Sequence, residues 1–306
     1  MNELMKLFQN KWVRLVLIVL IVGATLVVFT KYLIDNPDII GLIFSMHPAA
    51  IALLALAYVG TIVANAFVLS ASLRMIGKRV GFVENVSLTG YSSVVNFFGP
   101  LQSGPGFRAA YLKQRHDVSL RKFLYATLVF YGFFAVINGL VILAALLARA
   151  PAGRVIPLAV STLLIVVSAS FLAYRFIPKL RDVTKNIKVT SLHFWAIGIG
   201  ALALSLCTAA AYFVELLHVD VTITFLQTIV YAAAANLALF VSLTPGAIGF
   251  RESFLLLTQQ LHQIPTDTVI AASIIDRAFY VLFLLALFLF LLAIGVRTKL
   301  RSSNRR

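Results

Sequence analysis

The stretch Leu243-Thr244-Pro245-Gly246-Ala247-Ile248-Gly249-Phe250-Arg251-Glu252 interrupts a long apolar run, first with helix-breaking residues and then with charge. A second interruption, Ser103-Gly104-Pro105-Gly106-Phe107-Arg108, carries the same Gly-Phe-Arg triplet in the first half of the chain. Hydrocarbon offers no hydrogen-bond partners to broken backbone, so such breaks persist in membrane proteins only where they are buried in protein or line a cavity. One break in each half is typical of an internally repeated transporter whose substrate binds near the bilayer midplane.

The composition around these breaks is that of a polytopic helical membrane protein. Of the 306 residues, 61% are hydrophobic and 12% are charged, and the mean hydropathy is +0.97. The formal net charge of +15 comes from short basic clusters between apolar runs. That distribution encodes topology and argues against nucleic acid as a partner. The single cysteine, Cys207, can form no internal disulfide.

The apolar runs predict an all-α fold with six full membrane spans, because each approaches the roughly 20 residues that a helix needs to cross a bilayer. The first run follows basic residues, but it is longer than the apolar part of a signal peptide, and we expect it to be a retained helix. The predicted spans are residues 13–29, 49–73, 123–147, 155–176, 192–217 and 269–294.

Two shorter apolar segments, residues 86–98 and 225–243, each run into one of the breaks. If both crossed the membrane, two basic clusters would face outward, against the positive-inside rule. If each is instead half of a re-entrant helical hairpin, most of the 26 Lys and Arg residues lie on one side. This topology predicts a multi-pass protein of the inner (cytoplasmic) membrane with both termini in the cytoplasm.

The same topology predicts inverted repeats within one transmembrane domain, residues 1–306. Residues 49–148 would form a helix, a hairpin entering from the cytoplasm and a second helix, and residues 192–295 would repeat this order from the opposite side. The helices at 12–30 and 155–176 fall outside the repeats. Asn96 and Asn236 precede the two triplets, and we expect them to line a cavity between the hairpin tips.

The helix starts near Gly106 and Gly249 have the chemistry of an anion site. A helix that begins inside the membrane exposes free N–H groups and a partial positive charge. Arg108 and Arg251 add forked, permanently charged donors that suit a phosphate or a carboxylate. The alternative is that the glycines serve helix packing and the two arginines only snorkel or cap neighbouring carbonyls.

Three further charges are predicted at membrane depth: Glu252 next to Arg251, and Asp276 with Arg277 in the last span. Pairing of Glu252 with Arg277, or of Asp276 with Arg251, would neutralise them. Structural ion pairing and a carboxylate that takes up a proton during transport are both compatible with the sequence.

The motif around the second break, followed by Asp276-Arg277, resembles the lysylphosphatidylglycerol synthase transmembrane (flippase-domain) family over nearly the whole chain. The resemblance implies an integral membrane protein that moves phospholipids or lipid-linked substrates between leaflets. Because the chain ends at Arg306, we expect a standalone member without the synthetase domain. Ala109 follows Arg108 where an acidic residue is expected, so we expect an asymmetric site. The motif residues are Pro245, Gly246, Gly249, Arg251, Glu252 and Arg277, with Gly104, Gly106 and Arg108 as a weaker first-half counterpart.

The sequence therefore predicts a lipid flippase or scramblase rather than an enzyme. It has no phosphate-binding Gly-x-x-x-x-Gly-Lys-Ser/Thr loop, and its five histidines are dispersed without metal-ligand spacing. We expect no cofactor, no metal and no catalytic residue. Two alternatives stay open: a carrier of a small soluble anion, and a membrane enzyme acting on a polyprenyl phosphate. The lipid, the energy source and the oligomeric state are left open, and a homo-oligomer is compatible with the sequence.

Overall fold

The computed structural model describes residues 34, 41, 44–99, 103–149, 191–240, 247 and 249–303, and the regular structure in these residues is entirely helical. Four helices are long and apolar enough to cross a membrane: α4 (Pro48–Met75), α7 (Leu120–Arg149), α10 (Ser191–Val219) and α14 (Thr266–Ser303). They contain the predicted spans at 49–73, 123–147, 192–217 and 269–294. The predicted spans at 13–29 and 155–176 lie outside the described residues.

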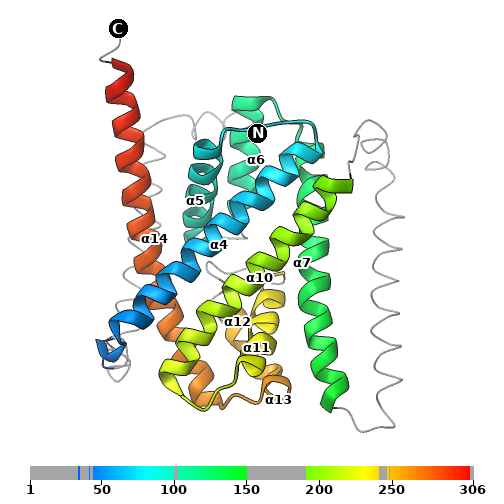
Figure 1. Ribbon diagram of the computed structural model, residues 1–306, viewed down its shortest axis with the longest axis vertical. Coiled ribbons are helices and arrows are strands. Elements are labelled where there is room, and N and C mark those ends of the chain that lie inside the picture. The colour runs from blue at the N-terminus through cyan, green and yellow to red at the C-terminus, as the bar shows by residue number, and fades with distance from the viewer. Residues whose placement is uncertain are drawn as a thin grey trace.

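The remaining helices are shorter: α5 (Phe82–Phe98), α6 (Ser103–His116), α11 (Phe225–Ala238), α12 (Phe250–Leu257) and α13 (Gln259–His262). At about 1.5 Å per residue, none of them reaches the roughly 30 Å of a bilayer core. In Figure 1, α5 and α6 occupy the upper half of the molecule, and α11, α12 and α13 occupy the lower half. The short helices therefore enter the fold from opposite ends.

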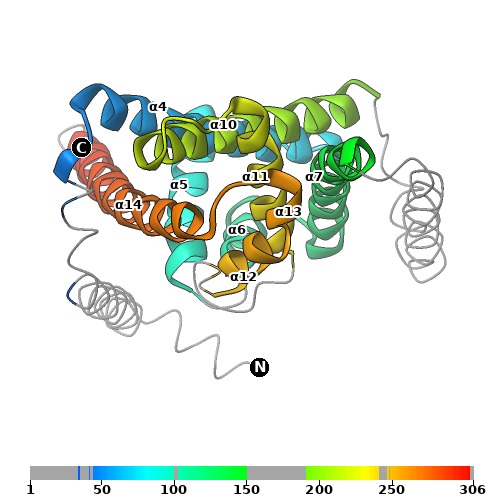
Figure 2. The same cartoon turned by 90° about the horizontal axis from the view of Figure 1, so that it is seen from below.

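The long helices form a frame around the short ones. Seen from below (Figure 2), α4 and α10 lie side by side along one face, α14 and α7 flank the molecule, and the short helices lie between them. A Cβ atom on Gly60 of α4 would come within 2.8 Å of Sγ of Cys207 on α10, so the small residue permits the close crossing. Cys207 thus packs in this helix contact.

Local sequence signals explain where several helices begin and end. Pro48 opens α4 behind the N-cap His47, whose ring nitrogen accepts from the Ala49 amide. α4 ends in a Schellman turn at Gly77, where φ is 78°. α11 begins with a capping box in which Thr224 and Gln227 satisfy each other's backbone amides.

The outward faces of the long helices are apolar, as a lipid environment requires. On α4 the exposed side chains include Leu53, Leu56, Val59, Val63 and Phe67. Such a continuous apolar surface would be unusual on a monomeric soluble protein. Together with the hydropathy of the four long helices, it identifies a multi-pass membrane protein.

Two helix boundaries differ from the sequence prediction. α6 begins at Ser103 rather than at Gly106, because Pro105 is compatible with the first turn of a helix, where its missing N–H would have no partner. α11 ends at Ala238 instead of continuing to residue 243. Phe240, just beyond its end, contacts Tyr131 and Phe134 of α7.

Candidate functional site: a buried charge cluster and a second arginine

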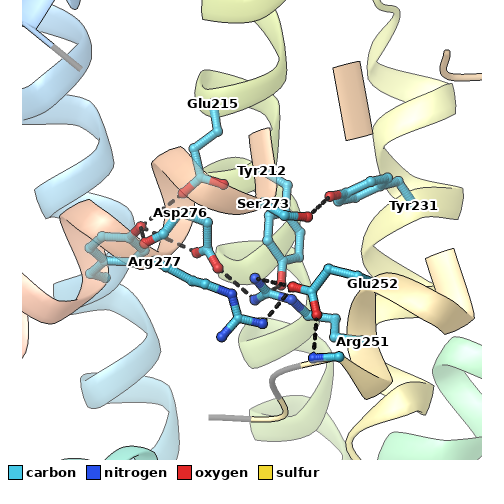
Figure 3. Close-up of polar contacts among 10 residues, drawn as sticks. Tyr212, Glu215, Tyr231, Arg251, Glu252, Ser273, Asp276 and Arg277 are labelled. Atoms are coloured by element: carbon cyan, nitrogen blue, oxygen red, sulfur yellow. Dashed lines mark hydrogen bonds and ion pairs between the residues drawn. The ribbon is translucent and has the colours of Figure 1, made fainter. Parts of the chain in front are cut away.

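A cluster of buried charges joins α12 and α14 (Figure 3). Nη1 of Arg251 lies 2.5 Å from Oδ2 of Asp276, and each side chain is 11% exposed. Nη2 of Arg277 lies 2.5 Å from Oε1 of Glu252. Both pairings that the sequence suggested are thus present in one structure. Pairing lowers the cost of holding these charges away from water.

Glu252 also closes the start of its own helix. Its Oε2 accepts a hydrogen bond of 2.8 Å from the backbone amide of Gly249, which is the N-cap residue with φ of 82°. Oε1 lies 3.7 Å from Nη2 of Arg251 as well as next to Arg277. The carboxylate therefore occupies the position that a helix start and two guanidinium groups make favourable for an anion.

The helices α10 and α4 add polar contacts to this cluster that were not predicted from the sequence. Tyr212 accepts a 3.1 Å hydrogen bond from Nη1 of Arg251, and the guanidinium carbon lies 5.8 Å from its ring centre. Glu215, one turn further along α10, is 0% exposed. Its Oε1 accepts a 2.8 Å hydrogen bond from Tyr58 of α4. The Tyr58 hydroxyl also lies 3.4 Å from Oδ1 of Asp276.

One sequence signal could have found Glu215: it is the only acidic residue in the apolar run 192–217, and an ionisable residue inside a membrane helix is a candidate functional residue by default. Tyr58 and Tyr212 carry no such signal, because tyrosines are common in membrane helices. Only the folded arrangement brings Tyr58 to Glu215, which is 157 positions away in the chain.

Arg108 of α6 lies in a different environment from Arg251. No carboxylate pairs with it among the residues that the structure describes, and its Nε is buried without a hydrogen-bond acceptor. Tyr131 of α7 lies near enough to interact electrostatically with the guanidinium of Arg108. Arg251 also keeps two buried donors, Nε and Nη2, without hydrogen bonds. Both arginines thus have donor capacity that the described residues do not use.

Asn96 and Asn236 make structural contacts. Oδ1 of Asn96 accepts a 3.2 Å hydrogen bond from the amide of Gly104, which ties α5 to α6. Asn236 is buried and donates to Oδ1 of Asn138 on α7 at 3.0 Å. That the two side chains also line a cavity between the hairpin tips stays a prediction.

The glycines of the breaks differ in their surroundings. A Cβ on Gly104 would come within 2.8 Å of both the Cβ atom of Asn96 and the backbone oxygen of Ser92, so this position needs glycine. A Cβ on Gly106 or Gly249 would meet nothing within 4 Å, and both glycines are exposed. Pro245 and Gly246 lie outside the described residues.

Outside the charge cluster, the base of the first hairpin is held by a polar cluster on Glu84. Tyr111 donates to Oε1 of Glu84 at 2.6 Å, and Nε2 of His116 lies 2.9 Å from the same oxygen. The Tyr111 hydroxyl holds the pKa of Glu84 below its usual value, and the His116 contact acts in the same direction. These contacts join the start of α5 to the end of α6.

Comparison with known families identifies the group to which the chain belongs. A family model described as the lysylphosphatidylglycerol synthase TM region matches residues 13–287. A search of curated proteins found no match for the chain. Because the match covers most of its length, the chain belongs to this family. Membership connects the protein with membrane lipids and agrees with the resemblance of its motifs.

Proposed function

We propose that this protein translocates a phospholipid or another lipid-linked anion between the leaflets of the cytoplasmic membrane, as a flippase or scramblase and not as an enzyme. Family membership supports a role connected with membrane lipids. The observation that carries the proposal is Arg108. Its Nε is buried without a hydrogen-bond acceptor, and no carboxylate pairs with the guanidinium among the described residues. An uncompensated cation within the membrane is costly unless an anion completes it.

Two matching contacts support the arrangement as inverted repeats with re-entrant hairpins. Phe97, at the end of α5, packs against Tyr280 of α14 with ring centroids 5.4 Å apart. Phe240, beyond the end of α11, packs against Tyr131 of α7 at 5.5 Å. In each case the tip of one hairpin contacts the last helix of the opposite half. The two hairpins would then meet near the middle of the membrane, where such carriers bind substrate.

The second half of the site would bind the same anion once the phosphate has replaced the carboxylate of Glu252 at the start of α12. Glu252 now occupies the start of α12 beside Arg277, so a headgroup phosphate would compete with an internal carboxylate there. Arg251 offers Nε and Nη2, which have no hydrogen-bond acceptor. We propose that the phosphate contacts Arg108 and Arg251 and displaces Glu252 from the helix start. The resulting site is asymmetric, since the first half has no such carboxylate.

The topology proposed for this function places the base of the first hairpin on the cytoplasmic side. Basic residues gather there, namely Arg74, Lys78, Arg79, Lys113, Arg115, Arg121 and Lys122. Lys78 donates to the carbonyl of His116 at 2.9 Å, so the end of α4 and the end of α6 lie at the same level. The positive-inside rule then orients the fold with both termini in the cytoplasm.

The test is leaflet exchange in vesicles that contain the purified protein and a fluorescent phospholipid. We expect exchange to be faster than in protein-free vesicles, and excess unlabelled phospholipid to slow it while inorganic phosphate does not. If exchange stays at the protein-free rate, the proposal fails. If inorganic phosphate is itself carried or competes equally well, the protein is a carrier of small anions. Chemical conversion of the lipid would instead identify an enzyme.

A further inference from the structure

Glu215 holds the carboxyl group that the ion pairs of the cluster do not neutralise (Figure 3). It is 0% exposed, and no salt bridge reaches it within the described part of the chain. Oε1 accepts the hydrogen bond from Tyr58, whereas Oε2 is buried with no donor. A buried carboxylate that no cation contacts is costly, and a proton of its own removes that cost.

The charges of the cluster point to a proton. Its two cations, Arg251 and Arg277, are balanced by two carboxylates: Asp276 pairs with Arg251, and Glu252 pairs with Arg277 and also lies 3.7 Å from Arg251. A proton on Glu215 makes the five groups neutral together. The hydroxyl of Tyr58 lies 2.8 Å from Oε1 of Glu215 and 3.4 Å from Oδ1 of Asp276, so the two carboxyl groups are close together, and a proton on Glu215 removes the repulsion between two negative charges.

Titratable or charged groups face Glu215 from every helix of the cluster. Tyr58 comes from α4, Tyr231 from α11, Arg251 from α12 and Asp276 from α14, and Tyr212 lies on the same helix. The helix α7 also packs on α10, through the hydrogen bond from Asn138 to Ser205 and the contacts of Phe133 with Phe194 and Trp195, and none of these side chains titrates. Among these groups the tyrosine hydroxyls are neutral, so the state of Glu215 decides the net charge of the cluster.

We infer that Glu215, bridged to Asp276 by Tyr58, is a proton-binding site whose occupancy controls binding of the anionic substrate. This inference deepens the proposed function and rests on it only for the coupling to transport. With the proton on Oε2, the cluster is neutral and Arg251 is available to a phosphate. When the proton leaves to water, the carboxylate keeps the electron pair and the cluster becomes negative. It then repels the phosphate.

By linkage, the anion must also favour protonation by the same factor with which the proton favours the anion. Proton and headgroup would therefore bind together and be released together. A proton gradient could then drive the lipid toward one leaflet. This gives the chain a coupling ion that needs no metal.

The first test detects the protonated carboxyl group of Glu215 directly and does not depend on a transport assay. Infrared difference spectra of the purified protein should contain the carbonyl band of a protonated carboxylic acid, shifted by exchange into D₂O. The band should be lost in Glu215→Gln and kept in Glu84→Gln, a matched change at the hairpin base. If the wild-type band is absent, or survives Glu215→Gln, the inference is overturned.

The second test measures binding of short-chain phosphatidylglycerol to the detergent-solubilised protein by its stabilising effect. Affinity should fall as pH rises for the wild type and for Glu84→Gln, and should lose this pH dependence in Glu215→Gln. Inorganic phosphate, measured alongside, shows whether the headgroup charge alone suffices. Equal pH dependence in Glu215→Gln would overturn the inference. Loss of lipid exchange with pH-linked binding intact would instead refute the proposed function.

Discussion

Arg251 of α12 and Asp276 of α14 form a 2.5 Å ion pair in which each side chain is only 11% exposed. Arg108, the corresponding arginine of the first triplet, has no such carboxylate among the described residues. The same residue type therefore has two different environments. Arg251 belongs to an internal network of ion pairs, whereas Arg108 has no carboxylate partner among the described residues, and in the proposed function its charge is completed by the ligand. This difference makes the stability of single variants informative.

Arg251→Met should destabilise the protein much more than Arg108→Met. Removing one partner of a buried pair leaves a charge unpaired, which costs about 3–5 kcal/mol, and Asp276 would be that charge. Removal of Arg108 leaves no carboxylate unpaired among the described residues. The thermal unfolding temperature of Arg108→Met in detergent should therefore be close to that of the wild type or higher. Equal losses of stability in the two variants would contradict this difference in environment.

Glu252→Gln should strengthen the binding of phosphate headgroups. The carboxylate of Glu252 accepts a hydrogen bond from the Gly249 amide and pairs with Arg277. A neutral glutamine would compete less well with a phosphate for these two groups. We expect affinity for short-chain phosphatidylglycerol to rise about tenfold, which corresponds to about 1.4 kcal/mol. Isothermal titration in detergent measures it. Weaker binding would mean that Glu252 assists the substrate instead of competing with it.

Gly104→Ala should loosen the first hairpin, whereas Gly106→Ala should not. The added methyl group of the first variant would lie 2.8 Å from a backbone oxygen of α5, and that of the second meets nothing within 4 Å. Overpacking of this kind costs about 1–3 kcal/mol. Thermal unfolding of the two variants under identical conditions provides the comparison. A larger loss for Gly106→Ala would contradict the observed helix contact.

Glu84 should make the hairpin base sensitive to acid. Its pKa is held below the usual value by Tyr111, so its stabilising contribution is complete above the unfolded carboxyl pKa of about 4.3 and is lost as pH falls through the lowered value. For a partly exposed cluster, we expect less than about 1 kcal/mol. The gap in thermal stability between wild type and Glu84→Gln should therefore shrink on acidification. A gap that widens would refute this sign.

Much of the fold followed from the sequence because hydrophobic length is a local property. The helices around 49–73, 123–147, 192–217 and 269–294 are present, and α5 ends at Phe98 as predicted. The end of α11 at Ala238 was harder to predict from the sequence, since apolar residues continue beyond it. There a contact between Phe240 and Tyr131 of another helix accompanies the turn.

The candidate site was predicted only in part. The ion pairs of Arg251 and Arg277 followed from the rule that buried charges are paired. The bridge from Tyr58 to Glu215 and Asp276 depends on how three helices pack, which no local pattern encodes. Asn236 was predicted to line a cavity because of its place before the break; it donates to Asn138 of α7, a contact that the sequence did not indicate, and its role in a cavity stays a prediction. A polar residue in a membrane helix can be used for packing as readily as for a ligand.

The most direct test of the account compares leaflet exchange by wild type, Arg108→Met and Arg115→Met in otherwise identical vesicles. Arg115 lies on the same helix, is exposed at its end, and serves as the matched control. The account predicts that Arg115→Met exchanges fluorescent phospholipid at nearly the wild-type rate while folded Arg108→Met falls to the protein-free rate. Exchange at the wild-type rate by Arg108→Met would contradict it.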